Sequence, residues 1–534
     1  MKSIKYLLLL VSFSAFAQEY PMGMDWDEES YRNIPYKANF TAATYTNLPN
    51  SYSLEKYAPI PGNQGQMGTC VAYAAAYGLR TIMLAKDAGI TDKNRITANA
   101  LSPTYVYSII KKEEDTNCSK GANPIYGMEA LKVAGVPTLR SLPYSCNPTI
   151  STQIQMEAID YRIRDYQKLF FFDTQDYGVK TNATKKALTE GYPVLLGMKL
   201  PPSFFKATNT WRAIPSDKGT IAAKHGFHAM VVIGYDDTYE GGSFRLLNSW
   251  GTGWGDGGFI WVPYAEYEEW AMGAIQPYSY YKRKDVVTNN VEVIPSKPGS
   301  PGVPDKPDRR VAPTRPTHPR VQPNNRRNPI QPTIPEMRLD ANPIASKLPQ
   351  GSLRFETNTG IVMATTRVST RNLVVEDDIE AEELVAYKMT KAYPSGTRFR
   401  FYLTNENEGY IYAFATDLTQ KINKILPFED GMSPLIGANS ELAFPSEKKV
   451  IRMDNNPGTD YLLILFSQQK LDENALMETM QNTSGGLTSK ISAALGDKLI
   501  DKSSVKYAAG TPGFEVDEDA TGYVVPLMVE ITHQ

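Results

Sequence analysis

The sequence predicts an α+β domain, then a proline-rich linker, then a second domain built mostly of β-strands. In residues 51–284, segments with helical spacing come before strand-like segments, an order typical of a domain with a helical half and a sheet half. Residues 295–350 carry repeated prolines and few apolar side chains, and polar–apolar alternation returns in residues 352–534. At 534 residues, the chain is too long for one ordinary domain.

Three helices are expected in the first domain, each from its apolar spacing and from the residues that stop it. The first begins at Cys70, runs through an alanine-rich segment to Met83 and ends by Gly89. The second covers residues 127–134, where a glycine and a proline follow. The third covers residues 180–190.

Four strands are expected after these helices. They are short apolar runs bounded by turn residues, at residues 193–200, 229–235, 244–248 and 259–263. Residues 18–50, which precede the domain, are polar and aromatic with weak periodicity. We interpret them as a short leader or pro-segment.

The second domain shows the alternation of a β-sandwich. Residues 398–403 alternate polar and apolar side chains, and residues 410–414 continue as a strand after a turn. Further strands are expected at residues 421–426, 450–453 and 461–466, with a helix at 472–480. The basic, proline-rich stretch before this domain is interpreted as a solvated, semi-extended spacer. Contact with an acidic polymer or a membrane surface is the alternative.

The N-terminus has the features of a secretory signal. Lys2 and Lys5 flank an apolar run, and residues 15–17 (Ala-Phe-Ala) form a small-x-small cleavage site. The run is too short for a permanent membrane helix. We therefore expect residues 1–17 to be removed and the protein to be exported, to the periplasm or outside the cell. A buried N-terminal helix is the alternative.

Composition restricts the cysteines and the ligands. Export implies an oxidising compartment, where Cys118 and Cys146 could pair and leave Cys70, the third cysteine, as a thiol. A net charge of −2 and a pI of about 6.2 give no sign of nucleic-acid binding. Four histidines and three cysteines are too few for several metal sites, so no metal or cofactor is expected.

Residues 63–73 carry the strongest sign of chemistry. Gln64 precedes Cys70 by six residues, with glycines between them and small apolar residues after. At the start of a helix, unpaired N–H groups and the positive end of the dipole favour a thiolate at Cys70. The Gln64 side chain and the Cys70 backbone N–H would then supply two donors to an oxyanion.

A thiol nucleophile needs a base, and the base needs a group that orients it. His228 opens a buried apolar strand and is favoured as this base over His225, which lies in a polar turn. Asn248 ends a later strand, where its amide oxygen can accept the imidazole N–H and fix the tautomer. Trp250 could lie over that hydrogen bond and exclude water.

Together these three segments resemble the papain family of cysteine peptidases. The resemblance covers residues 50–284 and implies a two-lobed fold, with a helical lobe and a barrel-like β lobe. It implies Gln64 as oxyanion-hole donor, Cys70 as nucleophile, His228 as general acid and base, and Asn248 as its orienter, with Trp250 shielding Asn248. It also implies that Cys118 and Cys146 form one of the disulfides of the family.

The sequence departs from the family pattern around the expected cleft. Met67 replaces a half-cystine just before the nucleophile, and Ala122 is expected at the place of its lost partner. The Gly-Gly wall that binds the substrate backbone is expected at about Pro124-Ile125. Phe227 and Ala229, on either side of His228, are expected to line the pocket for the second residue before the scissile bond, with Trp250 close by, and to favour apolar side chains there.

The long inhibitory pro-region of the family has no counterpart, because only about 30 residues separate the signal from the domain. Latency would then come from this leader or from the C-terminal domain. The latter resembles an uncharacterised β-rich domain found behind bacterial secreted peptidases, through residues 409–414, 425–427 and 457–463. It is expected to contact a surface or a partner, or to regulate the peptidase.

The function expected is that of a secreted cysteine endopeptidase acting on peptides or proteins through a thioester acyl-enzyme. Two alternatives stay open. One is a cysteine amidase or transpeptidase acting on cell-wall or other acyl donors, because the acyl-enzyme would be the same. The other is a non-catalytic binding protein on a degenerate peptidase scaffold.

Overall fold

The structure is a computed structural model that describes residues 20–176, 178–218, 226–280, 348–368, 386–417, 422–429 and 431–534. All of these described residues belong to one compact unit. The expected signal and nearly all of the proline-rich stretch lie outside the described residues. Among the residues that are described, no helix combines the length and apolar character needed to cross a membrane.

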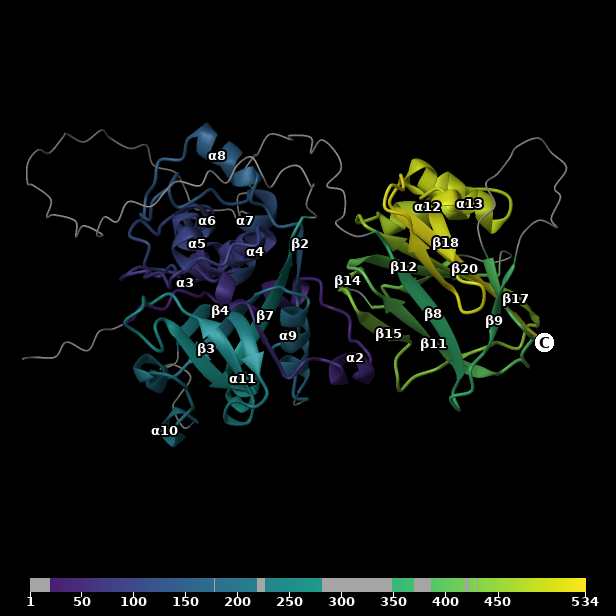
Figure 1. Cartoon of the computed structure of the whole chain (residues 1–534), viewed down its shortest axis with the longest axis horizontal. Helices are drawn as coiled ribbons and strands as arrows, with labels where there is room; N and C mark the ends of the chain where they lie inside the picture. The colour runs from purple at the N-terminus through teal and green to yellow at the C-terminus, as the bar shows by residue number, and fades with distance from the viewer. Residues whose placement is uncertain are drawn as a thin grey trace, which may run out of the picture. The chain divides into compact units, whose positions relative to one another are not determined.

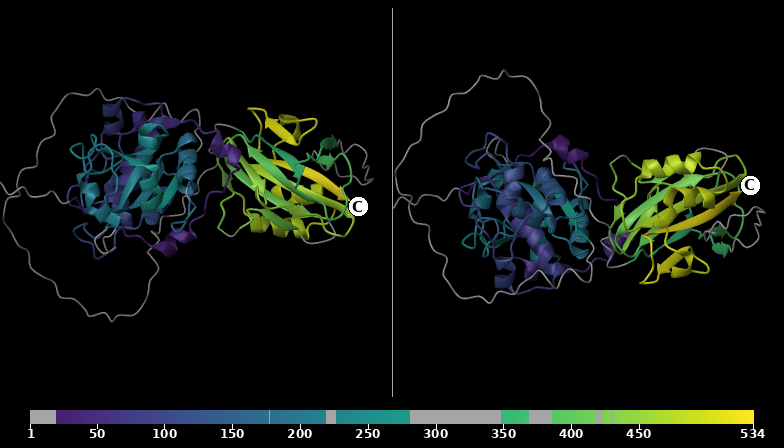
Figure 2. Two further views of the ribbon diagram at one scale, coloured as in Figure 1. Left: turned by 90° about the horizontal axis from the view of Figure 1, so that it is seen from below. Right: turned by 90° about the horizontal axis from the view of Figure 1, so that it is seen from above.

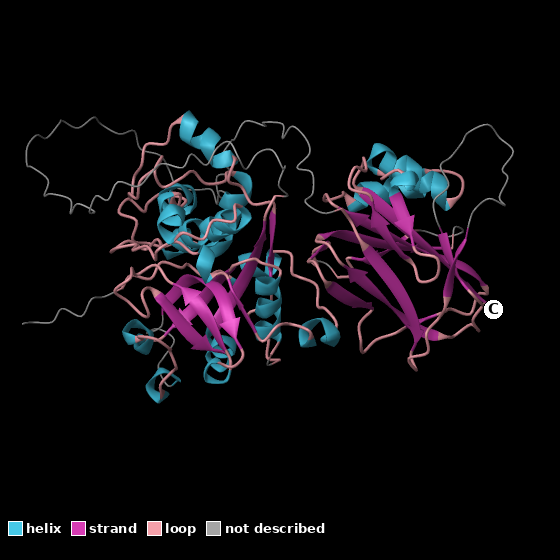
Figure 3. Cartoon of the chain, in the orientation of Figure 1, coloured by secondary structure: helices cyan, strands magenta, loops and turns pink. Residues whose placement is uncertain are grey.

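Residues 20–280, the N-terminal part, separate into a helical half and a sheet half, as the colouring in Figure 3 shows. Its helices are α1 (Glu28–Asn33), α2 (Ala42–Thr46), α3 (Cys70–Ala72), η2 (Tyr73–Arg80), α4 (Thr81–Asp87), α5 (Lys93–Ala98), α6 (Pro103–Ile110), α7 (Pro124–Val133), α8 (Thr152–Ile159), α9 (Val179–Thr189), α10 (Pro215–Lys218) and α11 (Tyr264–Trp270), with short 3₁₀ turns η1 (Glu55–Tyr57), η3 (Pro202–Lys206) and η5 (Tyr239–Gly241). The expected α+β fold is confirmed for this part.

The sheet half is one antiparallel sheet in the order β2-β7-β3-β4-β5-β6, with β1 also paired to β4. Its strands are β1 (Ser51–Ser53), β2 (Asp165–Lys168), β3 (Val194–Leu200), β4 (Gly226–Asp236), β5 (Ser243–Leu247), β6 (Phe259–Pro263) and β7 (Ala271–Tyr278). The four expected strands correspond to β3 to β6. Strand β7 was not expected, because Gly273 and Pro277 are poor strand formers and interrupt its pattern.

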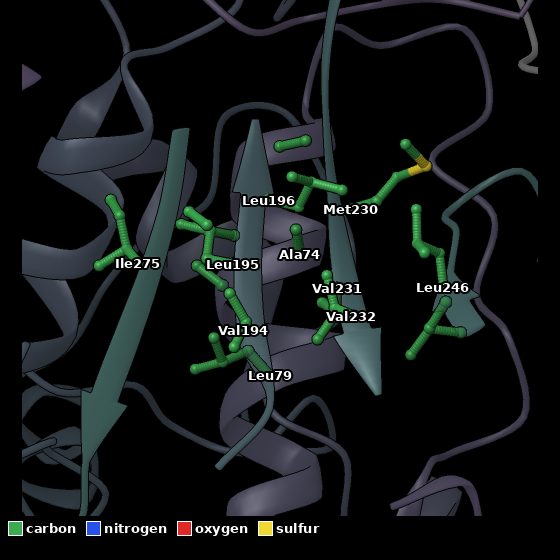
Figure 4. Packing of buried hydrophobic residues seen from close by; sticks show 14 of the residues in the cluster. Ala74, Leu79, Val194, Leu195, Leu196, Met230, Val231, Val232, Leu246 and Ile275 are labelled. Atoms are coloured by element: carbon green, nitrogen blue, oxygen red, sulfur yellow. The ribbon is translucent and has the colours of Figure 1, made fainter. Parts of the chain in front are cut away.

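The expected first helix runs without a break through α3, η2 and α4. Its residues from Cys70 to Met83 are all buried, and Ala74 and Leu79 pack on β3 and β4 (Figure 4). Gly78 permits this approach, since a Cβ there would lie 2.8 Å from Val231 Cγ2. The middle of the helix is π-helical, a distortion that is frequent at functional sites.

The second expected helix is α7, which begins three residues early because the Asn123 side chain accepts the Ile125 N–H and caps it. The third is α9, within one residue of the expected bounds. The expected leader forms α1 and α2, and its Tyr31 is fully buried in the core of the N-terminal part.

Residues 348–534, the C-terminal part, form two sheets that pack face to face (Figures 1 and 2). One sheet has the order β13-β12-β17-β20-β10-β9, with β14 on β12, and the other β15-β11-β8-β19-β18, with β16 on β11. The strands are β8 (Gly351–Thr357), β9 (Thr365–Val368), β10 (Ala386–Met389), β11 (Arg398–Asn405), β12 (Gly409–Thr416), β13 (Asn423–Leu426), β14 (Leu435–Ile436), β15 (Ser440–Phe444), β16 (Ile451–Arg452), β17 (Gly458–Ser467), β18 (Val505–Tyr507), β19 (Gly513–Val516) and β20 (Val524–His533).

Strand β12 shows why this sheet is covered on both faces. Its Ile411 and Ala413 enter the core between the two sheets, whereas Tyr410, Tyr412 and Phe414 face a second apolar cluster. That second cluster includes residues of α12 (Glu473–Asn482) and α13 (Leu487–Leu495). The expected mostly-β domain is confirmed, with a pair of helices of which only the first was expected.

Leu196 on β3 gives a test of the core, because it is fully buried between β4 and β7 (Figure 4). Leu196→Ala should destabilise the N-terminal part by about 2–5 kcal/mol. Val133 on α7 is 43% exposed, so Val133→Ala should change stability by less than about 0.5 kcal/mol. All six tryptophans lie in residues 26–270, and their fluorescence during urea unfolding measures this part. Equal effects of the two substitutions would contradict the described packing.

Candidate active site

Cys70 lies at the start of the long buried helix, at the positive end of the helix dipole. It is the first residue of α3 and is fully buried. Its thiol contacts the backbone of Gly23 and of Ala229, the residue after His228. The helical half thus presents this thiol to the strand that carries the histidine.

Gln64 is held in one orientation by three hydrogen bonds. Its Oε1 accepts from Ser249 Oγ at 2.6 Å. Its Nε2 donates to Met67 O at 2.8 Å and to Pro21 O at 3.2 Å. A backbone carbonyl therefore already rests on the side-chain donor that was expected to hold an oxyanion.

His228 and Asn248 are joined by a hydrogen bond of 2.8 Å between Nε2 and Oδ1. Asn248 Oδ1 also accepts the Ser249 backbone N–H at 2.8 Å, which fixes it as the acceptor. His228 Nε2 is then the protonated nitrogen, and Nδ1, buried without a hydrogen-bond partner, is left to exchange a proton. The Trp250 ring lies over the imidazole, with ring centroids 4.7 Å apart.

Residues 20–26, which we call the cleft segment, cross this group of side chains. Tyr20 stacks on Trp250 with ring centroids 4.7 Å apart, and Pro21 reaches Gln64 as described. Gly23 comes so close to the loop before Cys70 that a Cβ on it would lie 1.9 Å from Gly68 O. Only glycine fits at this position while the cleft segment is in place.

Three apolar side chains of the cleft segment cover glycines of the sheet. Met22 lies over Gly226, and Met24 over Gly197, where a Cβ would be 3.0 Å from the Met24 sulfur. Trp26 lies over Gly273, at 2.7 Å from a Cβ there. Gly273, Gly197 and Ala229 pair directly across β7, β3 and β4, so they share one face. That face is a floor almost without side chains.

The opposite walls are backbone. Met24 N donates to Phe227 O at 3.3 Å. Ala122 N donates to Gly23 O, and Asp25 N donates to Ala122 O, each at 2.9 Å. The wall expected at Pro124-Ile125 is therefore placed differently, since those residues begin α7 and Ala122 pairs with the cleft segment instead.

Cys118 and Cys146 form a disulfide, and Cys70 is a free, buried thiol. Cys118 O accepts the Gly68 N–H at 2.7 Å. The disulfide-bonded loop is thus attached to the turn that precedes Cys70. His225, the alternative base, lies outside the described residues.

Burial keeps Cys70 and His228 neutral in this state. It raises the pKa of the Cys70 thiol to about 11. It lowers the pKa of His228 to about 4, against the hydrogen bond to Asn248, which acts to raise it. Because burial is the first cause of both shifts, exposing the site to water would bring both pKa values toward ordinary ones.

Two parts of the chain match known family models. The family model described as papain family cysteine protease matches residues 53–278. Residues 53–278 belong to the papain family of cysteine proteases. These residues therefore form a cysteine-type peptidase domain, that is, a hydrolase. A model described as a domain of unknown function, DUF4384, matches residues 392–470 in the C-terminal part.

Individual relatives are distant. The protease domain is similar to an uncharacterized peptidase C1-like protein of Acanthamoeba polyphaga mimivirus, 24% identical over 45% of this chain and 76% of that protein. It is also similar to a cysteine protease of Blomia tropicalis, 24% identical over 41% of this chain and 62% of that protein. Among solved structures, xylellain, a cysteine protease from Xylella fastidiosa, is 21% identical, with a TM-score of 0.39, over 49% of this chain and 96% of its own.

The structure adds residues that sequence reasoning missed. Ser249 orients both Gln64 and Asn248, although a serine beside an asparagine gave no sign of this. Gly197 and Gly273 form the surface under the cleft segment, but a glycine inside a strand gives no sign of this role in the sequence. The methionines and Trp26 at alternate positions of the cleft segment were the one available signal, since alternation is typical of an extended segment with one buried face.

The thiol of Cys70 should stay protonated at neutral pH while the cleft segment is in place. The ultraviolet thiolate absorbance of the full chain, measured against Cys70→Ala, should show no step from about pH 5 to about pH 9. Gly23→Val should displace the cleft segment by its clash with Gly68, and a thiolate step should then appear below about pH 8. Glu28→Ala, at an exposed position, is the control. A thiolate at neutral pH in the unaltered chain would contradict this account.

Proposed function

We propose that this chain is a secreted cysteine endopeptidase that uses Cys70, His228, Asn248 and Gln64. The observation that carries the proposal is the peptide backbone already lying in the cleft, with the Pro21 carbonyl on Gln64 Nε2 and the next residues beside Cys70. A cleft that pairs with backbone on both walls fits an extended peptide, and this favours peptides over other acyl donors.

The reaction proposed begins with proton transfer from Cys70 to His228 Nδ1. The thiolate attacks the carbonyl carbon of the peptide bond, and the oxygen becomes an oxyanion held by Gln64 Nε2 and the Cys70 backbone N–H. His228 gives its proton to the leaving amine, which produces a thioester. Water, activated by His228, then hydrolyses the thioester and restores the thiol. Asn248 keeps Nε2–H bonded throughout and so holds the imidazole in place.

The described state is proposed to be latent. The cleft segment occupies the oxyanion donor and covers the thiol, so a substrate cannot enter until that segment leaves. Both reacting groups are neutral in this state because of burial. Departure of the segment would restore water and allow the thiolate–imidazolium pair to form.

Catalytic variants test the proposal in the Gly23→Val chain, in which the cleft is expected to be open. Cys70→Ala should abolish hydrolysis of casein and labelling by a thiol-reactive epoxide, and Gln64→Ala should lower kcat by about 100-fold or more. Isolated cell-wall peptides, assayed in parallel, measure the amidase alternative. Activity that survives Cys70→Ala would contradict the mechanism. A folded Gly23→Val protein that neither hydrolyses substrate nor reacts with the epoxide would favour the non-catalytic alternative.

The bare floor predicts a preference for a large apolar side chain such as methionine or phenylalanine in the pocket that Met24 occupies. In the Gly23→Val background, Gly197→Val should lower kcat/KM for peptides with such a residue by about 10- to 200-fold, with little change for alanine peptides. Gly253→Ala is the control, because a Cβ there meets no atom within 4 Å. An equal loss on both peptide classes would contradict the pocket assignment.

A further inference from the structure

Residues 35–46, which we call the clamp segment, follow the cleft segment after α1. Tyr36, Ala38 and Phe40 alternate along it, and all three are buried in the apolar core of the C-terminal part. Lys37, between them, points the other way and bonds Glu190 and Gln276 of the N-terminal part, at 2.5 and 2.7 Å. This period of two is that of an extended strand. At the border of the two parts, Tyr36 also contacts Phe171, with ring centroids 5.5 Å apart.

The backbone at residues 35–37 is hydrogen-bonded on both sides, through Pro35 O and Lys37 N on one side and through Tyr36 on the other. Toward the N-terminal part, Lys168 N donates to Pro35 O at 3.0 Å and Lys37 N donates to Lys168 O at 2.9 Å. Toward the C-terminal part, Tyr36 N donates to Gly431 O at 2.8 Å, and Ser433 N donates to Tyr36 O at 3.0 Å. The clamp segment therefore acts as a strand shared by β2 and the C-terminal part.

Further contacts extend this attachment to the end of the clamp segment. Tyr36 Oη donates to Glu429 at 2.6 Å. Thr41 N donates to Glu441 O at 2.9 Å. Ala42 N, at the start of α2, donates to Glu447 Oε2 at 2.9 Å. The partners of all three groups belong to the C-terminal part.

We infer that the C-terminal part is a binding site for the chain's own leader, and that by holding the clamp segment it keeps the cleft segment over Cys70. This inference rests on the proposed function. Residues 27–34 are the whole connection between the two segments. Among them, Tyr31 contacts the N-terminal part, where its hydroxyl donates to Phe170 O at 2.8 Å. A short tether keeps the cleft segment at high effective concentration, so releasing one end weakens the hold of the other.

The kind of competitor follows from the same contacts. It is an extended peptide with apolar side chains at three alternate positions and free backbone groups on one edge. Such a peptide, bound in place of the clamp segment, would free the leader and activate the protease domain. The domain of unknown function is in this way assigned a regulatory role.

The test is the rate at which a thiol-reactive epoxide labels Cys70 in the full chain. Ala38→Asp places a charge in the apolar core of the C-terminal part and should release the clamp segment. Labelling should then rise at least about tenfold, toward the rate of Gly23→Val. Asn39→Asp is the matched control: it adds the same charge one residue later, at an exposed position, and should label like the unaltered chain.

Some residues outside the clamp segment also join the N-terminal and C-terminal parts, and their contacts stay available in the Ala38→Asp protein. Arg164 pairs with Glu408, and Gln167 Nε2 donates to Leu435 O at 2.8 Å. Should Ala38→Asp fail to fold, Tyr36→Phe removes only the hydroxyl bonded to Glu429. That milder variant should raise labelling by about fivefold.

Hydrogen exchange in the same samples decides the outcome. The inference is supported if the clamp and cleft segments lose protection together as labelling rises. It is overturned if the clamp segment loses protection while labelling stays at the rate of the unaltered chain. Slow labelling of a folded Gly23→Val protein would instead overturn the proposed latency, so the two failures are distinguishable.

Discussion

The site depends on one junction, where the strand-end turn at residues 248–251 is joined to the loop before Cys70. Gln64 N donates to Ser249 O at 2.9 Å, and Gly251 N donates to Gly62 O at 2.9 Å. Ser249 Oγ closes the junction on Gln64 Oε1. Because Cys70 comes from the helical half and His228 from the sheet half, these bonds help to set how the two residues lie relative to each other. Ser249 also orients both neighbouring amides, because its N–H donates to Asn248 Oδ1 and its hydroxyl donates to Gln64 Oε1.

The chemistry of the site could be predicted from sequence further than its surroundings could. Each of the four candidate residues is of a type suited to a specific chemical task, and three of them lie at or near the start or end of an element. They are Gln64, Cys70, His228 and Asn248. The structure brings together Gln64 with the cleft segment and His228 with Asn248. Their catalytic roles stay predictions. The helix from Cys70 was predictable because its burial is continuous.

The floor and the leader could not be predicted, because their signals are spread over distant residues. Gly197 and Gly273 matter only when β3 and β7 pair, and the residues of β7 show no clear strand pattern. The leader is ordered by contacts with two folded parts rather than by its own periodicity. Its Gly23 is required by the approach of Gly68, more than forty residues further along the chain.

Burial links the leader to the chemistry. The same segment that covers Gly197 and Gly273 also helps to bury Cys70 and His228, so the position of this segment and the neutrality of the two side chains are coupled. The clamp segment extends this coupling to the C-terminal part. The C-terminal part can then influence the protonation state of Cys70, through the free energy with which it holds the clamp segment.

The most direct measurement is to trap the acyl-enzyme. The Gly23→Val chain, mixed with a slowly hydrolysed peptide ester and quenched in acid, should carry the acyl group as a thioester on the peptide that contains Cys70, found by mass spectrometry. The unaltered chain should carry much less, because its cleft is occupied. An acyl group on another residue, or none in a folded Gly23→Val protein, would contradict the account.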